Sequence, residues 1–274
     1  MVDSCRTCEY CTSGDEQFCE NGSTMTYAGV DKYGKVTNGG YSTHIVAEED
    51  FVLRVPEGLS SESVAPLLCA GITLYSPLKR WGAGPGKKVA IVGMGGLGHM
   101  GVKIAAAMGA EVTVLSQTLR KADDAKSYGA ARCFATSDEA TFQQLKGQFD
   151  VIINTVSAPL DFAAYLKLLK VGGAMVVVGL PDKPVELQLS PLIMGRRILA
   201  GSLIGGIKET QEMLDFCGQH HLGAEVEVIS AGDVNDAYDR VVRSDVRYRF
   251  VIDASTIASA EVEHEAKAEP VGAH

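Results

Sequence analysis

The sequence predicts an α/β fold, a doubly wound parallel sheet joined to a smaller, β-rich part. Three features predict it. Short apolar runs alternate with helical segments between residues 88 and 203, as expected when helices cover both faces of a parallel sheet. A glycine-rich turn follows the first of these runs. Short segments bounded by turn residues lie on both sides of this block and read as additional strands.

The first part of the chain carries cysteines in the spacing Cys-x2-Cys-x2-Cys-x7-Cys, namely Cys5, Cys8, Cys11 and Cys19. Four thiolates in so short a segment have the number and spacing of a closed, tetrahedral zinc site, with no position left open for chemistry. We therefore predict a structural Zn²⁺ site that these four residues bind.

Disulfides and a nucleic-acid zinc ribbon are the main alternatives. Nothing before Cys5 resembles a secretory signal, so we expect a cytoplasmic protein without disulfides. The chain has 34 acidic and 25 basic residues and a net charge of -9, which would repel phosphate backbones and disfavours a ribbon. Redox and other metal roles stay open. With no apolar run near the ~18 residues of a membrane span, we expect no membrane partner.

Strands are predicted at residues 39–46 and 51–56, which are rich in β-branched and aromatic residues and are bounded by turn residues. The central block then supplies six strands, at residues 88–92, 111–115, 131–134, 149–153, 174–178 and 198–203. These runs lack strict polar alternation, as is typical of strands buried on both faces. Residues 226–229 and 248–252 read as two more strands. The composition after Asp253, rich in Ala, Ser, Glu and Lys, predicts a disordered tail.

The turn after residues 88–92 has the sequence Gly93-Met94-Gly95-Gly96-Leu97-Gly98. It stands between a predicted strand and a helix that ends at Gly109, the context in which a G-x-G-x-x-G motif binds a dinucleotide. The first glycine permits the tight turn, the second lets a pyrophosphate approach the backbone, and the last lets helix and strand pack closely.

The end of the second strand predicts which dinucleotide binds. NAD-selective sites usually place an acidic residue there to hold the ribose 2′-hydroxyl. This chain has Ser116 instead, followed by Gln117, Thr118, Arg120 and Lys121. These hydroxyl and cationic groups favour NADP(H), whose extra phosphate they can bind. The alternative is that Arg120 and Lys121 are only the solvated start of a helix.

Several motifs together resemble zinc-dependent medium-chain alcohol dehydrogenases, above all the NADP-dependent, cinnamyl alcohol dehydrogenase-like branch. They are the cysteine array, Asn38-Gly39-Gly40-Tyr41, Leu68-Cys69-Ala70-Gly71-Ile72-Thr73, the glycine turn with His99-Met100-Gly101, and Arg247-Tyr248-Arg249-Phe250-Val251-Ile252. The resemblance implies a Rossmann domain plus a partial GroES-like catalytic domain. It also implies a homodimer and the reversible oxidation of a primary alcohol to an aldehyde, with hydride transfer to the nicotinamide.

The resemblance assigns roles residue by residue. Cys69 matches a ligand of the catalytic zinc; the alternative is a small buried apolar residue. Thr73 and Thr155 should approach the nicotinamide, while Ser116, Thr118 and Lys121 should hold the 2′-phosphate. The turn residues Gly93, Gly95, Gly96, Leu97 and Gly98 should bind the pyrophosphate.

The chain departs from the family pattern at its start. Relatives carry a further segment before the structural cysteines, with the other catalytic-zinc ligands and the proton-relay hydroxyl, whereas this sequence starts at Met1 after them. None of His44, His99, His220 and His221 matches a ligand position, and Asn154 replaces an expected acidic residue. We therefore expect an incomplete catalytic zinc site. The hypotheses are an NADP-dependent alcohol dehydrogenase and a truncated NADPH- and zinc-binding protein without turnover.

The same motifs suggest a division of the chain. We expect a partial catalytic domain with the zinc loop over residues 1–69 and an NADP-binding domain over residues 70–207. Residues 208–254 should return to the catalytic domain, and residues 255–274 should form the tail.

Overall fold

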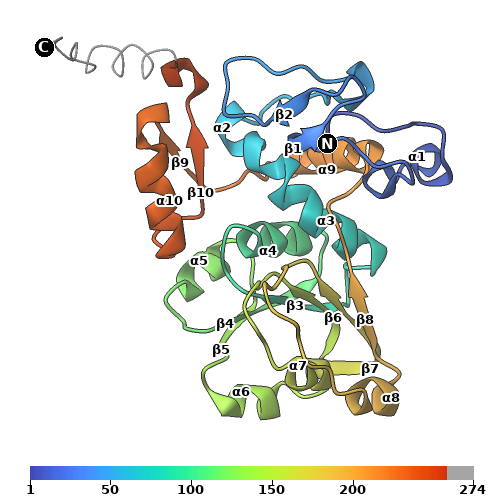
Figure 1. Cartoon of the computed structure of the whole chain (residues 1–274). Helices are drawn as coiled ribbons and strands as arrows, with labels where there is room; N and C mark the ends of the chain where they lie inside the picture. Colours follow the sequence, from blue (N-terminus) through green and yellow to red (C-terminus); the bar gives the residue numbers. More distant parts are fainter. Residues whose placement is uncertain (258–274) are drawn as a thin grey trace, which may run out of the picture.

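The computed structural model describes residues 1–257, and its central element is a parallel six-stranded sheet (Figure 1). The strand order is β5-β4-β3-β6-β7-β8. The strands are β3 (Lys88–Val92), β4 (Glu111–Ser116), β5 (Arg132–Ala135), β6 (Phe149–Asn154), β7 (Leu169–Val177) and β8 (Ile198–Gly201). The chain moves outward from β3 to β5 and then returns to start again at β6, which is the doubly wound Rossmann order. The predicted fold class is confirmed.

Helices cover both faces of this sheet. One face carries α3 (Ala70–Arg80), α4 (Gly98–Ala107) and α5 (Ala122–Ser127), and the other carries α6 (Glu139–Gln144), α7 (Phe162–Leu168) and α8 (Ser190–Gly195). In β3, Val89 and Ile91 join the first apolar cluster, whereas Ala90 and Val92 join the second. All four are at most 1% exposed. Burial on both sides explains why the strands show no polar alternation.

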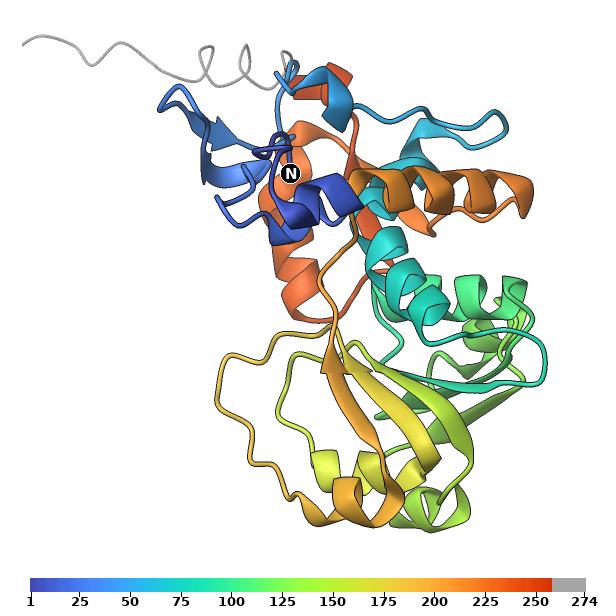
Figure 2. The same cartoon turned by 90° about the vertical axis from the view of Figure 1, so that its right-hand side faces the viewer.

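The remaining elements form a second part, to which both ends of the described chain contribute (Figures 1 and 2). Its elements are α1 (Glu9–Ser13), η1 (Glu16–Phe18), β1 (Tyr27–Val30), β2 (Val36–Asn38), η2 (Glu49–Phe51), α2 (Ser61–Val64), η3 (Ala65–Leu68), α9 (Ile207–Gln219), β9 (Val226–Ile229), η4 (Ala231–Asp233), α10 (Val234–Val242), β10 (Arg249–Ile252) and η5 (Ala254–Thr256). The two predicted strands near residues 226–229 and 248–252 are present and pair with each other in parallel. None of the helices within residues 1–257 has the length and apolar character needed to cross a membrane.

The prediction of strands at residues 39–46 and 51–56 is wrong. Strand β2 ends at Asn38, and Glu49–Phe51 form a 3₁₀ turn. A strand needs a neighbour to satisfy its N–H and C=O groups, and no strand within residues 1–257 pairs with these segments. Tyr41, Val46 and Val52 are 67%, 93% and 67% exposed, so these apolar residues do not pack into the described core, and of the apolar residues of these two segments only Leu53 packs against it.

The predicted disordered tail lies mostly outside the described residues. Its first part does have structure: Ala254–Thr256 form a short 3₁₀ helix, η5. The Asp253 side chain caps it by accepting a hydrogen bond from the Ser255 backbone N–H at 2.9 Å. This cap stabilises a short helix at the start of the segment, although the composition there predicts disorder.

Candidate functional site

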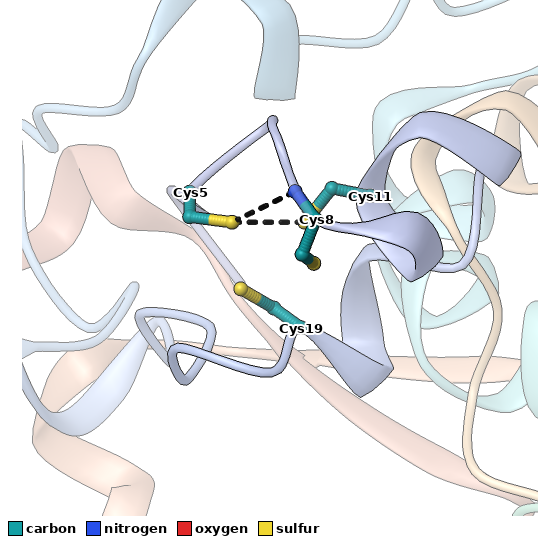
Figure 3. Close-up of side chains that lie close together, drawn as sticks. All are labelled: Cys5, Cys8, Cys11 and Cys19. Atoms are coloured by element: carbon teal, nitrogen blue, oxygen red, sulfur yellow. Dashed lines mark hydrogen bonds between the residues drawn. The ribbon is translucent and has the colours of Figure 1, made fainter.

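The four cysteines of the array converge in one place. Their Sγ atoms lie within 4.8 Å of one another and turn toward a common space (Figure 3). The Cys5 and Cys11 sulfurs are 3.9 Å apart, and tetrahedral coordination with Zn–S bonds of ~2.3 Å requires sulfurs ~3.8 Å apart. All seven cysteines of the chain are free of disulfides. The donor set and its spacing therefore fit Zn²⁺.

The acid–base properties of these thiols also fit a cation. Hydrogen bonds from the Asn21 side chain and from the backbone of Thr7 and Cys8 lower the pKa of Cys5 to about 5. Burial raises the pKa of Cys11 to about 12. One group is thus held as a thiolate while a neighbour resists ionisation. A divalent cation would supply the charge that ionises the whole set.

The segment that carries these thiols, which we call the cysteine lobe (residues 5–20), is attached to the start of α9 (Figure 2). Glu16 Oε2 accepts a hydrogen bond from the backbone N–H of Ile207, the first residue of α9, at 3.0 Å. The Gly14 carbonyl oxygen lies so close to Gly206 that a Cβ there would be 1.8 Å from it. The lobe therefore packs directly on the backbone that leads from β8 into α9.

The turn after β3 has a backbone that requires glycine at two positions. Gly93 has φ of +93°, in the left-handed region, and a Cβ on Gly98 would lie 2.0 Å from the Gly93 carbonyl oxygen. This contact brings the N-terminus of α4 against the end of β3. Thr155 Oγ1 donates a hydrogen bond to the Val92 carbonyl at 2.7 Å, so the end of β6 closes the other side of the turn.

The middle of the turn is open to an anion. A Cβ on Gly95 would meet no atom within 4 Å, whereas one on Gly96 would lie 2.3 Å from Arg249 Nε. Leu97 directly precedes α4, and the N-terminus of a helix carries a positive partial charge. An accessible backbone at a helix N-terminus is the arrangement that binds pyrophosphate.

Arg249 is a candidate that the sequence analysis missed. Its Nε is buried and has no hydrogen-bond partner within residues 1–257. A guanidinium with an unused buried donor beside the glycine turn fits an anionic ligand. In the sequence, Arg249 is only a basic residue at the start of a predicted strand. Its local sequence gives no indication that the fold places it next to Gly96.

The residues after β4 lie at the same turn. Ser116 is the last residue of β4, Thr118 is exposed in the following loop, and Lys121 directly precedes α5. The Lys121 ammonium donates a hydrogen bond to the Met94 carbonyl at 3.2 Å. The structure therefore places the predicted cation beside the glycine turn rather than free in solvent.

The charges around Lys121 also suit an anion. Burial, followed by the positive charges of Arg247 and Arg120, lowers the pKa of Lys121. Asp124 acts in the opposite direction, and a bound phosphate group would likewise raise the pKa of Lys121.

Cys69 stands directly before α3 and is exposed, so the alternative that it is a small buried residue is wrong. Thr73 is 7% exposed in the first turn of α3, and its backbone N–H bonds to the Cys69 carbonyl at 3.1 Å. Within residues 1–257, the array of four cysteines is the one place where three or more metal-binding side chains converge. The described residues therefore do not bring two further ligands to Cys69, and a three-ligand zinc site does not fit them.

The histidines have other environments. His99 is fully buried; its Nε2 accepts the Glu225 backbone N–H at 3.3 Å, and its ring stacks on Tyr248 at 4.9 Å. His44, His220 and His221 are exposed. Asn154 is 1% exposed and its Oδ1 accepts the Val156 backbone N–H at 3.0 Å, so it shapes the backbone after β6.

Comparison with known proteins identifies the family. The sequence pattern of zinc-binding dehydrogenases matches residues 96–219. "NADP-dependent alcohol dehydrogenase C 1" of Mycolicibacterium smegmatis is 57% identical over 260 residues, which cover 94% of this chain and 74% of the relative. "Probable formaldehyde dehydrogenase AdhA" of Bacillus subtilis is 58% identical over 257 residues, with the same coverage of both chains.

Solved structures agree. A cinnamyl alcohol dehydrogenase from Sorghum bicolor superposes with a TM-score of 0.90 at 45% identity, covering 93% of this chain and 73% of that one. The CAD from Helicobacter pylori, solved in complex with NADP(H), gives a TM-score of 0.86 at 41% identity and the same coverage. With this fold, this glycine turn and these relatives, the chain belongs to the zinc-dependent medium-chain alcohol dehydrogenases, in the NADP-dependent, cinnamyl alcohol dehydrogenase-like branch.

Proposed function

We propose that the chain interconverts primary alcohols, including aromatic alcohols of the cinnamyl type, and aldehydes with NADP(H). In the oxidation the alcohol carbon gives a hydride to C4 of NADP⁺ and the alcohol oxygen loses a proton. The observation that carries the cofactor assignment is the Lys121 ammonium, 3.2 Å from the Met94 carbonyl of the glycine turn. No carboxylate occupies the end of β4, where Ser116 stands, so a 2′-phosphate meets a cation and a hydroxyl there.

The proposed roles follow the geometry of the turn. The backbone of Gly93, Gly95, Gly96, Leu97 and Gly98, together with the Arg249 guanidinium, binds the pyrophosphate. Ser116, Thr118 and Lys121 bind the 2′-phosphate, and Thr73 and Thr155 lie toward the nicotinamide. Cys5, Cys8, Cys11 and Cys19 hold a structural zinc ion. Cys69 is proposed as a catalytic-zinc ligand, but because residues 1–257 do not bring two further ligands to it, we derive no catalytic step through that ion.

Cofactor selectivity tests the assignment of the loop after β4. Lys121→Ala should weaken NADPH binding ~10- to 100-fold, the size of one lost charge-assisted contact, and leave NADH binding nearly unchanged. Titration calorimetry with both cofactors measures this. Lys126→Ala is the matched control, because Lys126 lies on α5, which directly follows Lys121, is 62% exposed at its side chain and pairs with Asp123. Equal affinities of the unmutated chain for NADPH and NADH would refute the assignment.

Aldehyde-dependent loss of NADPH absorbance tests the reaction itself. Any turnover of cinnamaldehyde that depends on added Zn²⁺ should disappear in Cys69→Ser and persist in Cys133→Ser. Cys133 is the control because it lies in β5, where its thiol faces the Ala122 carbonyl at 3.8 Å. NADPH binding without any turnover would instead favour the alternative, a protein that binds NADPH and zinc only.

We also propose a homodimer and the division of the chain at residues 69, 207 and 254. Strand β8 is the last strand in the sheet order, and exposed apolar side chains lie on and near it: Ile193, Met194, Ile198 and Leu203. An open strand edge with apolar neighbours pairs readily with a second copy. Ile198→Lys should therefore give a monomer in sedimentation experiments, whereas Val242→Lys, on the exposed face of α10, should not. An unchanged mass for Ile198→Lys would exclude this edge.

A further inference from the structure

We propose that Tyr248 is a positioning residue for the cofactor 2′-phosphate: its ring holds the Lys121 ammonium at the glycine turn and thereby strengthens the preference for NADPH over NADH. The inference rests on the proposed function, in which Lys121 binds that phosphate. It assigns a role in cofactor selectivity to a residue of the C-terminal segment, far in sequence from the glycine turn.

Two contacts fix the position of the ammonium. Lys121 Nζ lies 4.6 Å from the centroid of the Tyr248 ring, within the range of a cation–π interaction. The same atom donates to the Met94 carbonyl at 3.2 Å. A lysine side chain loses considerable rotamer freedom when it is held in one place. A lysine already held by the ring and the carbonyl loses less of that freedom when a phosphate binds, so its affinity is higher.

The Tyr248 ring is itself held on several sides. It is 2% exposed. The His99 ring stacks on it at 4.9 Å with an interplanar angle of 10°, and Tyr128 contacts it edge-on at 6.0 Å. Its hydroxyl donates a hydrogen bond to Asp124 of α5. A ring held in this way presents a fixed face to the ammonium.

Asp124 is a negative charge near Lys121 that would repel a phosphate, and two hydrogen bonds reduce its effect. The Asp124 carboxylate accepts hydrogen bonds from both the Tyr248 hydroxyl and the Arg247 guanidinium. Asp124 is the acidic residue of α5 that contacts Tyr248 and Arg247. Burial, and then the bond to Asp124, raises the pKa of Tyr248, so the phenol stays neutral and continues to donate.

The arrangement joins segments that are distant in sequence. Tyr248 directly precedes β10, which lies near α4 and α5 of the nucleotide-binding part (Figure 1). Its backbone N–H also bonds to the Glu225 carbonyl at 3.0 Å. Through Tyr248, the C-terminal strand pair contacts the loop that would hold the 2′-phosphate.

The test is calorimetric titration of the full chain with NADPH and with NADH. Tyr248→Leu should lower the NADPH-to-NADH affinity ratio roughly 3- to 30-fold, as expected for a lost cation–π contact. Tyr248→Phe keeps the ring and loses only the hydroxyl bond to Asp124, so its ratio should fall less than that of Tyr248→Leu. Phe250→Leu is the matched control, because its ring belongs to the same C-terminal segment but faces another cation, Arg240, at 4.7 Å. It should destabilise the fold without changing the ratio.

Two further proteins keep the test decisive if Tyr248→Leu does not fold. Pentafluorophenylalanine at position 248 keeps the ring volume but withdraws negative charge from its face, so its ratio should fall relative to Tyr248→Phe. In Lys121→Ala, removal of Tyr248 should have no additional effect. An unchanged ratio in Lys121→Ala itself would overturn the proposed 2′-phosphate site. A reduced ratio in Lys121→Ala with an unchanged ratio in the Tyr248 variants would overturn the positioning role alone.

Discussion

His99 makes the stability of the nucleotide-binding part depend on pH. Burial, and then the positive charge of Lys103, lowers its pKa from 6.5 to about 4; Arg249 acts in the same direction and Glu225 in the opposite one. Between these two values the unfolded chain binds a proton that the folded protein does not. The free energy of unfolding therefore falls as pH drops below 6.5, and this contribution is fully present above that value.

Denaturant unfolding at pH 7 and pH 5 measures this contribution. The lowered pKa of His99 should reduce the free energy of unfolding by about 2 kcal/mol between pH 7 and pH 5. His99→Gln keeps an acceptor for the Glu225 N–H but does not titrate. Its free energy of unfolding should therefore decrease by about 2 kcal/mol less than that of the unmutated chain over the same pH range. The comparison also removes the contribution of the cysteines, which both proteins share. Identical losses in the two proteins would mean that His99 has the same pKa in the folded and unfolded states.

Two glycines of the same turn should respond differently to one added methyl group. Gly98→Ala places a Cβ 2.0 Å from the Gly93 carbonyl and should cost roughly 3 kcal/mol of stability. Gly95→Ala meets no atom within 4 Å, so stability should stay within ~0.5 kcal/mol while NADPH affinity falls at least ~10-fold. Thermal unfolding and calorimetry separate the two effects. Normal NADPH binding by Gly95→Ala would show that the cofactor does not approach this backbone.

At the scale of elements, the contact between the cysteine lobe and α9 should contribute to stability. Glu16 accepts the first N–H of a 13-residue helix at 3.0 Å, a position where a negative charge is favourable. Glu16→Ala should cost about 1 kcal/mol, and Glu16→Gln less, since the amide oxygen can still accept. Glu20→Ala, an exposed acidic residue of the same lobe, is the control in denaturant unfolding. An equal cost for both alanine variants would deny Glu16 its capping role.

The elements also show which parts of the fold a sequence can predict. The four inner strands of the sheet, β3, β4, β6 and β7, were predictable because each contains an apolar run buried on both faces. The edge strands β5 and β8 are less buried, and their short apolar runs were enough to predict them. The strands predicted at residues 39–46 and 51–56 failed because strand composition does not reveal whether a neighbour is present to pair with. In the candidate site, the glycines and Lys121 follow from local motifs. Arg249 and Tyr248 do not, because only the fold brings β10 to the glycine turn.

At the scale of the molecule, the number of zinc ions that the chain holds follows from how many sets of metal-binding side chains the fold brings together. The four cysteines fit one zinc ion, and residues 1–257 bring no second set together. The purified chain should therefore hold about one zinc per subunit, with sulfur-only coordination, by elemental analysis and X-ray absorption. Cys11→Ser should lower both zinc content and melting temperature, whereas Cys217→Ser, a buried cysteine outside the array, should leave zinc content unchanged. Two zinc ions with nitrogen ligands would contradict this prediction.

The position of the cysteine lobe links metal occupancy to the cofactor. Gly14 and Glu16 contact Gly206 and Ile207, where the backbone leaves the sheet for α9. This segment, the crossing, joins the nucleotide-binding sheet to the second part of the molecule. A cysteine lobe without its metal would no longer offer the crossing a rigid surface to pack against. If loss of the metal weakens NADPH binding through the crossing, thermodynamic reciprocity requires NADPH to raise the affinity for zinc by the same factor. Cofactor binding would then strengthen the binding of a metal ion that takes no part in hydride transfer.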